Sequence, residues 1–476
     1  MKAYIYNNVL VLMLCAAAVH AADAFAQEAA RDITLDQARE LALQHNKEIS
    51  KSKLTLEQTQ YDAKAYKSNF LPRLDLSAID VYSSNKGDFA LAGGHLPIYS
   101  LNTSTGAYAP DVTMNSDGSY TLNQYADFPA QEIDYKIGNI FVGGLMLTQP
   151  LYMGGKITAA YRMASIGTQI AGENIRLTES QVILNTDEAY MQAIRARQLA
   201  GVARSYKTLL DELMKNVESA VRHGLKTRNE QLKVQVKLNE AELAIQRADN
   251  ATRLSTMNLC HVLGLPLNTP LQLDESQFSD EAAAPERQAH GLTVDARPEL
   301  AILQAKTDIA GQQVKLTRSD FMPQLALFAE YSYLNGIKIG SSKLLNSGSA
   351  AVGATLKVPL LTFGERTNKI RSAKTRQQIA QTEQQDLTEQ MQLELAQADN
   401  NYAEAVTELD ITRRSLEQAE ENLRLARQQY DVGMEPLSQL LDAQAMWQQT
   451  SADHVDAKCQ LQVAHTKLLK AQGVLK

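Results

Sequence analysis

The side chains that could do chemistry are few, and their spacing forms no catalytic or metal site. His454 and His465 are eleven residues apart in one predicted helix, which places them three turns apart and too far to bind one metal ion. Gly154-Gly155-Lys156 lacks the spacing of a phosphate-binding loop. Cys260 and Cys459 form no Cys-x-x-Cys motif and are interpreted as small buried residues. The sequence therefore predicts no enzyme, no cofactor and no metal site.

The composition argues against two further classes of protein. Of the 476 residues, 21% are charged, which is too polar for a bundle of membrane helices. Lys and Arg number 47 against 54 Asp and Glu, and the net charge of −7 predicts no nucleic-acid partner, because that partner requires a basic face. With only 24 Gly and 12 Pro, the chain can form long uninterrupted elements.

Residues 1–26 have the pattern of a secretory signal peptide. Lys2 precedes an apolar run over residues 9–18, and Ala24-Phe25-Ala26 supplies a cleavage site of small residues. We expect cleavage after Ala26, with Ala21 as the alternative. The run is shorter than the ~20 residues of a membrane-spanning helix. Met13 and Leu14 precede Cys15 where a lipid-attachment site has small residues, so the sequence favours an exported protein without a lipid anchor.

The chain contains the same pattern twice. Short motifs recur at a shift of 251 residues and, further on, of 209 residues: Phe70-Leu71-Pro72 with Phe321-Met322-Pro323, then Gln149-Pro150-Leu151 with Val358-Pro359-Leu360 and Gly224 with Gly433. The first copy thus has 42 extra residues, and we expect residues 86–136, rich in Gly, Ser, Asn, Thr and Tyr, to form a long loop. The predicted divisions are the signal peptide, a first repeat, a linker broken by prolines and a second repeat, at residues 1–26, 27–265, 266–294 and 295–476.

Each repeat is predicted to contain one very long helix, over 156–222 and 366–432, or ~100 Å at 1.5 Å per residue. In the second, two stripes keep a seven-residue spacing without drift, which indicates a coiled coil. They are Tyr402, Leu409, Leu416, Leu423 and Tyr430, and Ala398, Ala405, Thr412, Ala419 and Ala426. Shorter helices over 34–69 and 228–264 are expected to run beside one long helix.

Alternating side chains predict the strands. Residues 324–334 and 351–360 alternate apolar with polar or small side chains, as strands of a transmembrane β-barrel do. Segment 137–155 is uncharged but also alternates and contains Pro150, so it is a poor membrane helix. Four strands cannot close a barrel, and open sheet edges are not tolerated in lipid. Several chains must therefore assemble one barrel.

Together these features resemble the TolC-like outer membrane efflux proteins over residues 31–473. The most specific motif is Tyr430-Asp431-Val432-Gly433, followed by Leu440-Leu441-Asp442-Ala443. The resemblance implies a mixed α and β fold and a homotrimer, in which four strands per chain form a twelve-stranded barrel in the outer membrane of a Gram-negative bacterium. The long helices would continue it as a coiled-coil barrel in the periplasm.

The same resemblance implies a passive exit duct of a tripartite efflux or type I secretion system. Its partners would be a periplasmic adaptor protein, an inner-membrane pump of the RND or ABC class, and outer membrane lipid. The alternative is an exported trimeric coiled-coil surface fibre or adhesin without channel activity. A fibre would not explain strand pairs beside both long helices. The sequence leaves open whether the cargo is a drug, a metal ion or a polypeptide.

The resemblance also implies residues of a periplasmic gate. In this family, carboxylates just past the turn of the second helical hairpin line the periplasmic aperture. Asp442 occupies one of these positions, and Gln439 occupies the other. Tyr430 matches a family tyrosine, Glu435 stands where the family has Arg, and Glu230 is a weaker analogue at the first tip. A ring of three Asp442 carboxylates would repel anions and bind cations.

The two hairpin tips are the expected docking points for the adaptor. Gly224 and Gly433 are predicted to form the turns, because a turn between antiparallel helices needs a residue comfortable at positive φ. Leu225 and Met434 follow them directly and are assigned to the same tips.

Overall fold

The structure is a computed structural model that describes residues 32–275, 293–339 and 342–475. The predicted signal peptide and most of the predicted linker lie outside the described residues. The chain forms two compact units, each built from both sequence halves. The helical unit draws on residues up to 63, 162–314 and from 372 onward. The strand unit contains residues 64–161 and 315–371.

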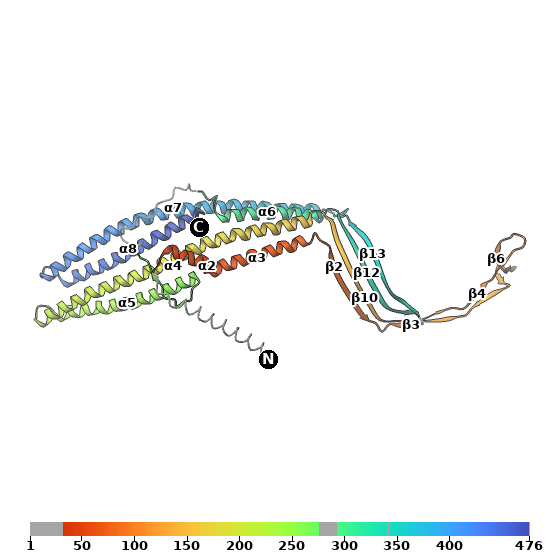
Figure 1. Ribbon diagram of the computed structural model, residues 1–476, viewed down its shortest axis with the longest axis horizontal. Helices are drawn as coiled ribbons and strands as arrows, with labels where there is room; N and C mark the ends of the chain where they lie inside the picture. The colour runs from red at the N-terminus through yellow and green to blue at the C-terminus, as the bar shows by residue number, and fades with distance from the viewer. Residues whose placement is uncertain (1–31, 276–292, 340–341, 476) are drawn as a thin grey trace, which may run out of the picture. The chain divides into compact units, whose positions relative to one another are not determined.

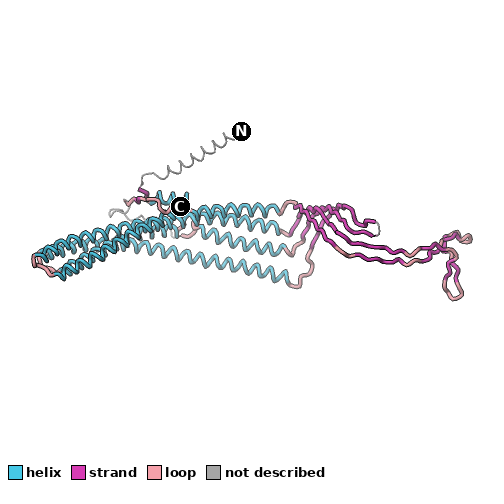
Figure 2. The backbone as a smooth tube through the Cα atoms, turned by 90° about the horizontal axis from the view of Figure 1, so that it is seen from below, coloured by secondary structure: helices cyan, strands magenta, loops and turns pink. Residues whose placement is uncertain are grey.

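Long helices running side by side form the helical unit (Figures 1 and 2). The helices of the described residues are α2 (Leu35–His45), α3 (Lys47–Ser68), α4 (Lys156–Arg222), α5 (Arg228–Leu263), α6 (Pro298–Ser319), α7 (Glu365–Asp431) and α8 (Leu437–Ala471). Helix α4 has the bounds expected from the sequence, and α7 differs from its expected range by one residue at each end. None of the described helices is both long and apolar enough to cross a membrane.

The predicted helix over 34–69 is interrupted at Asn46, which contradicts the sequence analysis. Asn46 is extended, with ψ of 132°. Its side chain accepts a hydrogen bond from the amide of Glu48 at 2.8 Å and donates one to the carbonyl of Val262 at 2.8 Å. The break is therefore stabilised by a helix cap and by a contact with α5. The residue of α5 in this contact is 216 positions away, so the local sequence does not predict it.

Both heptad stripes of α7 face other helices, as predicted. Tyr402, Ala405, Ala419, Ala426 and Tyr430 are buried, and the other stripe positions are half-buried. Most of the residues between the stripes are exposed. The alanine stripe lets neighbouring helices approach closely, so packing along the rod stabilises a helix too long to belong to a globular core.

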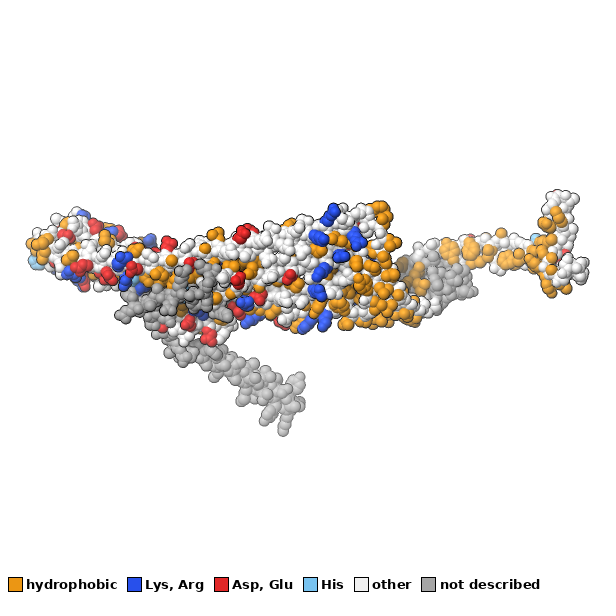
Figure 3. Space-filling view, turned by 90° about the horizontal axis from the view of Figure 1, so that it is seen from above, with side chains coloured by type: hydrophobic (Ala, Val, Ile, Leu, Met, Phe, Trp, Pro, Cys, Tyr) orange, Lys and Arg blue, Asp and Glu red, His pale blue; other side chains and the backbone are white. Residues whose placement is uncertain are grey.

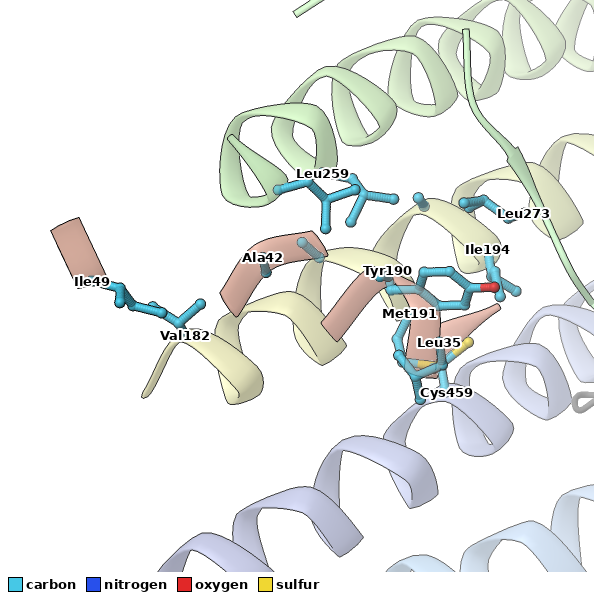
Figure 4. Close-up of a cluster of buried hydrophobic side chains, with 14 residues drawn as sticks. Leu35, Ala42, Ile49, Val182, Tyr190, Met191, Ile194, Leu259, Leu273 and Cys459 are labelled. Atoms are coloured by element: carbon cyan, nitrogen blue, oxygen red, sulfur yellow. The ribbon is translucent and has the colours of Figure 1, made fainter. Parts of the chain in front are cut away.

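A central hydrophobic cluster joins α2, α4, α5 and α8 (Figure 4). Tyr190 is fully buried, and its hydroxyl donates to the carbonyl of Ile33 at 2.6 Å. This contact holds strand β1 (Asp32–Ile33), which pairs in parallel with β11 (Gln272–Leu273). Neither short strand was expected from the sequence.

Beside this cluster, a buried carboxylate connects three helices. Arg39 donates to both oxygens of Asp187, at 2.8 and 2.6 Å, and Thr466 donates to it at 2.5 Å. The hydrogen bond to Asp187 raises the pKa of Arg39 above its ordinary value. Because Asp187 is fully buried, these three donors offset the cost of removing its charge from water.

Both cysteines of the described chain are buried and free, which confirms their structural interpretation. Burial raises the pKa of Cys459 to about 11. The thiol is therefore neutral at physiological pH and a poor nucleophile.

The strand unit is an antiparallel sheet in the order β13-β12-β10-β2. Its strands are β2 (Arg73–Tyr82), β10 (Gln131–Met153), β12 (Gln324–Ile339) and β13 (Ser342–Lys357), and β3 (Lys86–Leu91) pairs with the start of β10. The register aligns Leu74, Leu147, Ala329 and Val352 in one row across all four strands. The next row contains Asp75, Met146, Glu330 and Ala351. Alternating residues thus form one largely apolar face and one mixed face, as predicted.

The segment expected to be a plain loop, 86–136, is instead largely β-structure. Besides β3 and the start of β10, three antiparallel ladders form between β4 (Gly94–Pro97) and β9 (Tyr125–Phe128), β5 (Tyr99–Leu101) and β6 (Tyr108–Pro110), and β7 (Val112–Met114) and β8 (Tyr120–Leu122). Gly106 and Gly118 lie in the turns at positive φ. The turn-forming composition was recognised, but the short Tyr- and Thr-containing runs between the turns pair as strands.

We expect this insertion to be dispensable for folding. Gly87 and Tyr135 are paired across the β3–β10 ladder, so their Cα atoms are only ~5 Å apart. Replacing residues 88–134 with Asn-Gly should close a hairpin and leave the amount and heat-modifiable gel mobility of the protein in the outer membrane fraction unchanged.

The matched control replaces residues 330–351, whose flanking residues Ala329 and Val352 are also paired. This removes most of the central strand β12 and of the edge strand β13 and should abolish insertion. Loss of the protein from the membrane in the first variant would show that the insertion is structural.

Candidate functional site at the helical tips

The two helical hairpins end in the same type of turn. After α4, Gly224 has φ of 71°, and the amide of Leu225 donates to the carbonyl of Ala220 at 2.8 Å. After α7, Gly433 has φ of 79°, and the amide of Met434 donates to the carbonyl of Gln429 at 2.8 Å. Both are Schellman-type endings in which glycine takes the left-handed position. The sequence assignment of the two turn glycines is therefore confirmed in conformation.

The helices leaving the turns begin differently. Thr227 caps α5, and its amide in turn binds the Glu230 carboxylate at 3.1 Å. Lys226 lies 3.9 Å from the same carboxylate. Pro436 precedes α8 and provides no side-chain cap. The carboxylate of Glu230 is thus engaged by its own hairpin.

Tyr430 connects the two hairpins. It is buried among residues from α4, α5 and α8, including Val217, Val234 and Leu437. The Lys226 ammonium lies 4.6 Å from the centre of its ring, a cation–π geometry. Burial raises the pKa of Tyr430, and the nearby charges of Glu230 and Asp431 raise it further. The structure therefore brings Tyr430 and Glu230 into one cluster, with Lys226 as the member that the sequence analysis missed.

Asp442 lies on the exposed face of α8. Gln439, one turn earlier, is exposed on the same side, whereas Leu440 and Ala443 are buried. Lys237 of α5 lies near Asp442. The pKa of Lys237 is raised first by its hydrogen bond to Glu240, and the charge of Asp442 makes the smallest contribution. Lys237 was not found from the sequence, because nothing in the local pattern of α5 shows that α8 lies near it.

Apolar side chains are exposed at both tips. Leu225 is 77% exposed and Met434 is 80% exposed. Val432, next to the second turn, is 69% exposed. Large apolar groups so open to water form small surfaces suited to contact with another protein.

The charged residues of the tips do not form a metal centre. No group of three or more His, Cys, Asp or Glu side chains within the described ranges could hold a metal ion. The tips instead present the exposed carboxylate of Asp442 and the apolar side chains of the two turns.

Comparison with known proteins gives a consistent picture. A family model described as outer membrane efflux protein matches residues 38–265 and 292–474. Alkaline protease secretion protein AprF of Pseudomonas aeruginosa is 24% identical over 341 residues, 70% of each chain. Protein CyaE of Bordetella pertussis is 26% identical over 339 residues, 70% of this chain and 71% of its own. The solved structure of CusC matches with a TM-score of 0.70 at 16% identity and covers 94% of this chain and 95% of its own.

The left-handed turn predicts the effect of a substitution at Gly433. Nothing lies within 4 Å of a Cβ added there, so Gly433→Val would strain only the backbone, by ~1–3 kcal/mol. We expect faster hydrogen exchange of the amides around the turn and an unchanged sheet. Gly433→Asn is the control, because Asn tolerates this conformation. Equal exchange in the Val variant and the wild type would contradict the assigned turn.

Proposed function

The chain belongs to the outer membrane efflux protein family, and we propose that three copies form a passive duct gated at the helical tips. Membership in this family makes the chain an outer membrane channel of the efflux and type I secretion class, not an enzyme. It also excludes the surface fibre as an alternative. The number of copies, the partners and the gate belong to the proposal.

The open edges of the sheet support assembly from several copies. Strands β2 and β13 are the outer strands, and β13 has no neighbour on one side within the described chain. On the apolar face, Leu76 of β2 is 77% exposed and Val352 of β13 is 86% exposed, against 43% for Leu145 in central β10. Pairing of β13 with β2 of the next copy would satisfy both edges. Three copies would close a twelve-stranded barrel.

The face pattern gives the orientation of this barrel. The row Leu74, Leu147, Ala329 and Val352 would face lipid, because it is apolar across all four strands. The row containing Asp75 and Glu330 would face the lumen, where water can solvate carboxylates. The opposite orientation would place both carboxylates in hydrocarbon.

In the proposed duct, the gate lies close to the tips. Asp442 is exposed on α8 and lies five residues past the start of that helix at Leu437, or ~7.5 Å of helix. Three copies around an axis would bring their Asp442 carboxylates together, and the family resemblance places Gln439 and Tyr430 at the same aperture. Lys237 of α5 pairs with Glu240 at 2.7 Å, and we expect its positive charge to reduce the cation affinity of such a ring.

The proposed partners are a periplasmic adaptor and, through it, an inner-membrane pump of the RND or ABC class. Leu225 and Met434 would contact the adaptor, because they are the exposed apolar groups directly after the two turn glycines. The backbone hydrogen bonds that close both turns would limit the entropy lost on docking, so such small surfaces can still contribute to binding.

A bilayer experiment tests the duct and its gate. The purified protein should form channels, and di- or trivalent cations added on the side of the tips should block them. Asp442→Ala should weaken this block by roughly tenfold, and Lys237→Gln should strengthen it. Glu420→Gln, a change at an exposed carboxylate of α7, is the control. Absence of any conductance would overturn the duct, and full block in Asp442→Ala would place the gate elsewhere.

A second experiment tests the docking tips. Leu225→Asp with Met434→Asp should abolish crosslinking to the adaptor in cells, because two charges would have to be buried at each contact. Channel conductance should remain. Leu225→Met with Met434→Leu conserves the apolar surface and should crosslink normally. Wild-type crosslinking by the Asp variant would move the adaptor contact away from the tips.

A further inference from the structure

Basic side chains collect where the helices of the strand unit meet its strands. Residues 64–72, 154–161, 315–323 and 361–371 contain eight Lys and Arg but only two acidic residues, in a chain of net charge −7. All eight are exposed: Lys64, Lys67, Lys156, Lys315, Arg318, Arg366, Lys369 and Arg371. On the face shown in Figure 3, Lys and Arg side chains form a band beside a field of hydrophobic side chains. This positive charge is therefore local. We call these eight residues the basic band.

The band has a regular spacing. Lys64 and Lys67 in α3, Lys315 and Arg318 in α6, and Arg366 and Lys369 in α7 are each three residues apart, so each pair lies on one helix face. The first two pairs occupy equivalent positions in the two repeats, at the shift of 251. Helices α3 and α6 differ at most other equivalent positions. Both repeats thus carry the same charge at the same distance from the sheet.

Lys64, Lys156, Lys369 and Arg371 interact with other groups of the chain, and the other four residues of the basic band form no ion pair within the described residues. Lys156 binds Asp320 at 3.0 Å, and Lys369 binds Glu365 at 2.6 Å, which engages both carboxylates of these segments. Lys67, Lys315, Arg318 and Arg366 form no ion pair with any residue that the structure describes. Intrachain pairing therefore does not explain why the positive charges gather here.

Exposed apolar side chains border the band on its strand side. Leu71 is 63% exposed, Leu360 is 91% exposed and Phe363 is 92% exposed. Arg366 follows Phe363 by three residues, and Lys67 precedes Phe70 by three. Apolar and aromatic groups followed at this distance by Lys and Arg form the sequence of layers found where a protein leaves a bilayer.

We propose that the basic band binds the phosphates of anionic phospholipids, in the leaflet of the outer membrane that adjoins the helices. The proposal rests on the outer membrane location and not on the gate. Charge complementarity identifies the headgroup, and the adjacent apolar side chains identify a lipid rather than a soluble anion, because only a lipid can occupy both. Four exposed cations without internal partners, distributed over three helices, suit a row of headgroups better than a single enclosed site.

The test measures thermal unfolding of the purified full-length protein in detergent micelles. Micelles doped with phosphatidylglycerol should raise the Tm by several degrees relative to micelles doped with phosphatidylcholine. Inorganic phosphate at the same concentration should not. The fourfold variant Lys64→Gln, Lys67→Gln, Lys315→Gln and Arg318→Gln should lose at least half of the phosphatidylglycerol increment.

Two controls keep this test decisive. Changing Lys215, Lys233, Arg247 and Arg253 to Gln removes the same charge from exposed positions in α4 and α5 and should keep the full increment. If the fourfold variant does not fold, changing Lys64, Lys67 and Lys315 to Arg should keep the increment, and the single change Arg318→Gln should reduce it. An unchanged increment in the fourfold variant, or an equal effect of inorganic phosphate, would overturn the lipid assignment. Conductance of the same samples separates this outcome from failure of the duct proposal.

Discussion

The rest of this molecule depends on the fact that a sheet in lipid cannot leave its backbone hydrogen bonds open. Each unsatisfied N–H or C=O in hydrocarbon costs several kcal/mol, so a sheet bounded by β2 and β13 is not a stable membrane structure in one chain. The register is compatible with closure into a barrel, because the apolar side chains of the two edge strands lie on the same face as those of the two central strands. A neighbouring copy that pairs with either edge would find its own apolar row continued. The duplication of the sequence gives each chain two strand pairs instead of one. The proposed threefold assembly would then bring together enough strands to close the barrel.

A second constraint arises where strands change into helices. The chain must turn sharply at each transition, and Gly154, Gly155 and Gly364 take positive φ there. A Cβ on Gly154 would approach Ser319 and Met322 within 3 Å, so close packing as well as conformation requires glycine at this position. Beyond the turn, α7 is held by two narrow stripes rather than by a broad apolar face. Its packing therefore depends on neighbouring helices along much of its length, which is how helices of 67 residues can be stable outside a globular core.

Local signals explain which parts of this structure could be predicted from the sequence. The bounds of α4 and α7 follow from a glycine at either end, and the heptads of α7 give its buried face directly. The break at Asn46 could not be seen, because the contact with Val262 that stabilises it comes from α5. The ladders within 86–136 were missed for a related reason, since three-residue strands carry too little alternation to be distinguished from turns. At the tips, the sequence supplied the glycines and Tyr430, but Lys226 and Lys237 act on residues of the other hairpin, and only the tertiary structure shows them.

The charges at the tips form a different arrangement from the one implied by the family resemblance. Where the family has an Arg just past the second turn, this chain has Glu435, and one of the two aperture carboxylates is replaced by Gln439. The structure supplies cations from the first hairpin instead: Lys226 lies over the ring of Tyr430, and Lys237 lies near enough to Asp442 for the carboxylate to affect its pKa. Both lysines belong to the first hairpin, where they also pair with Glu230 and Glu240 of α5. In the proposed duct, movement of one hairpin relative to the other would separate Lys226 from the ring of Tyr430, so this cation–π contact as well as packing would favour the closed state. The attraction between Lys237 and Asp442 would weaken as ionic strength rises, because Asp442 is exposed and Lys237 is only half-buried, and exposed charges are screened within about 10 Å.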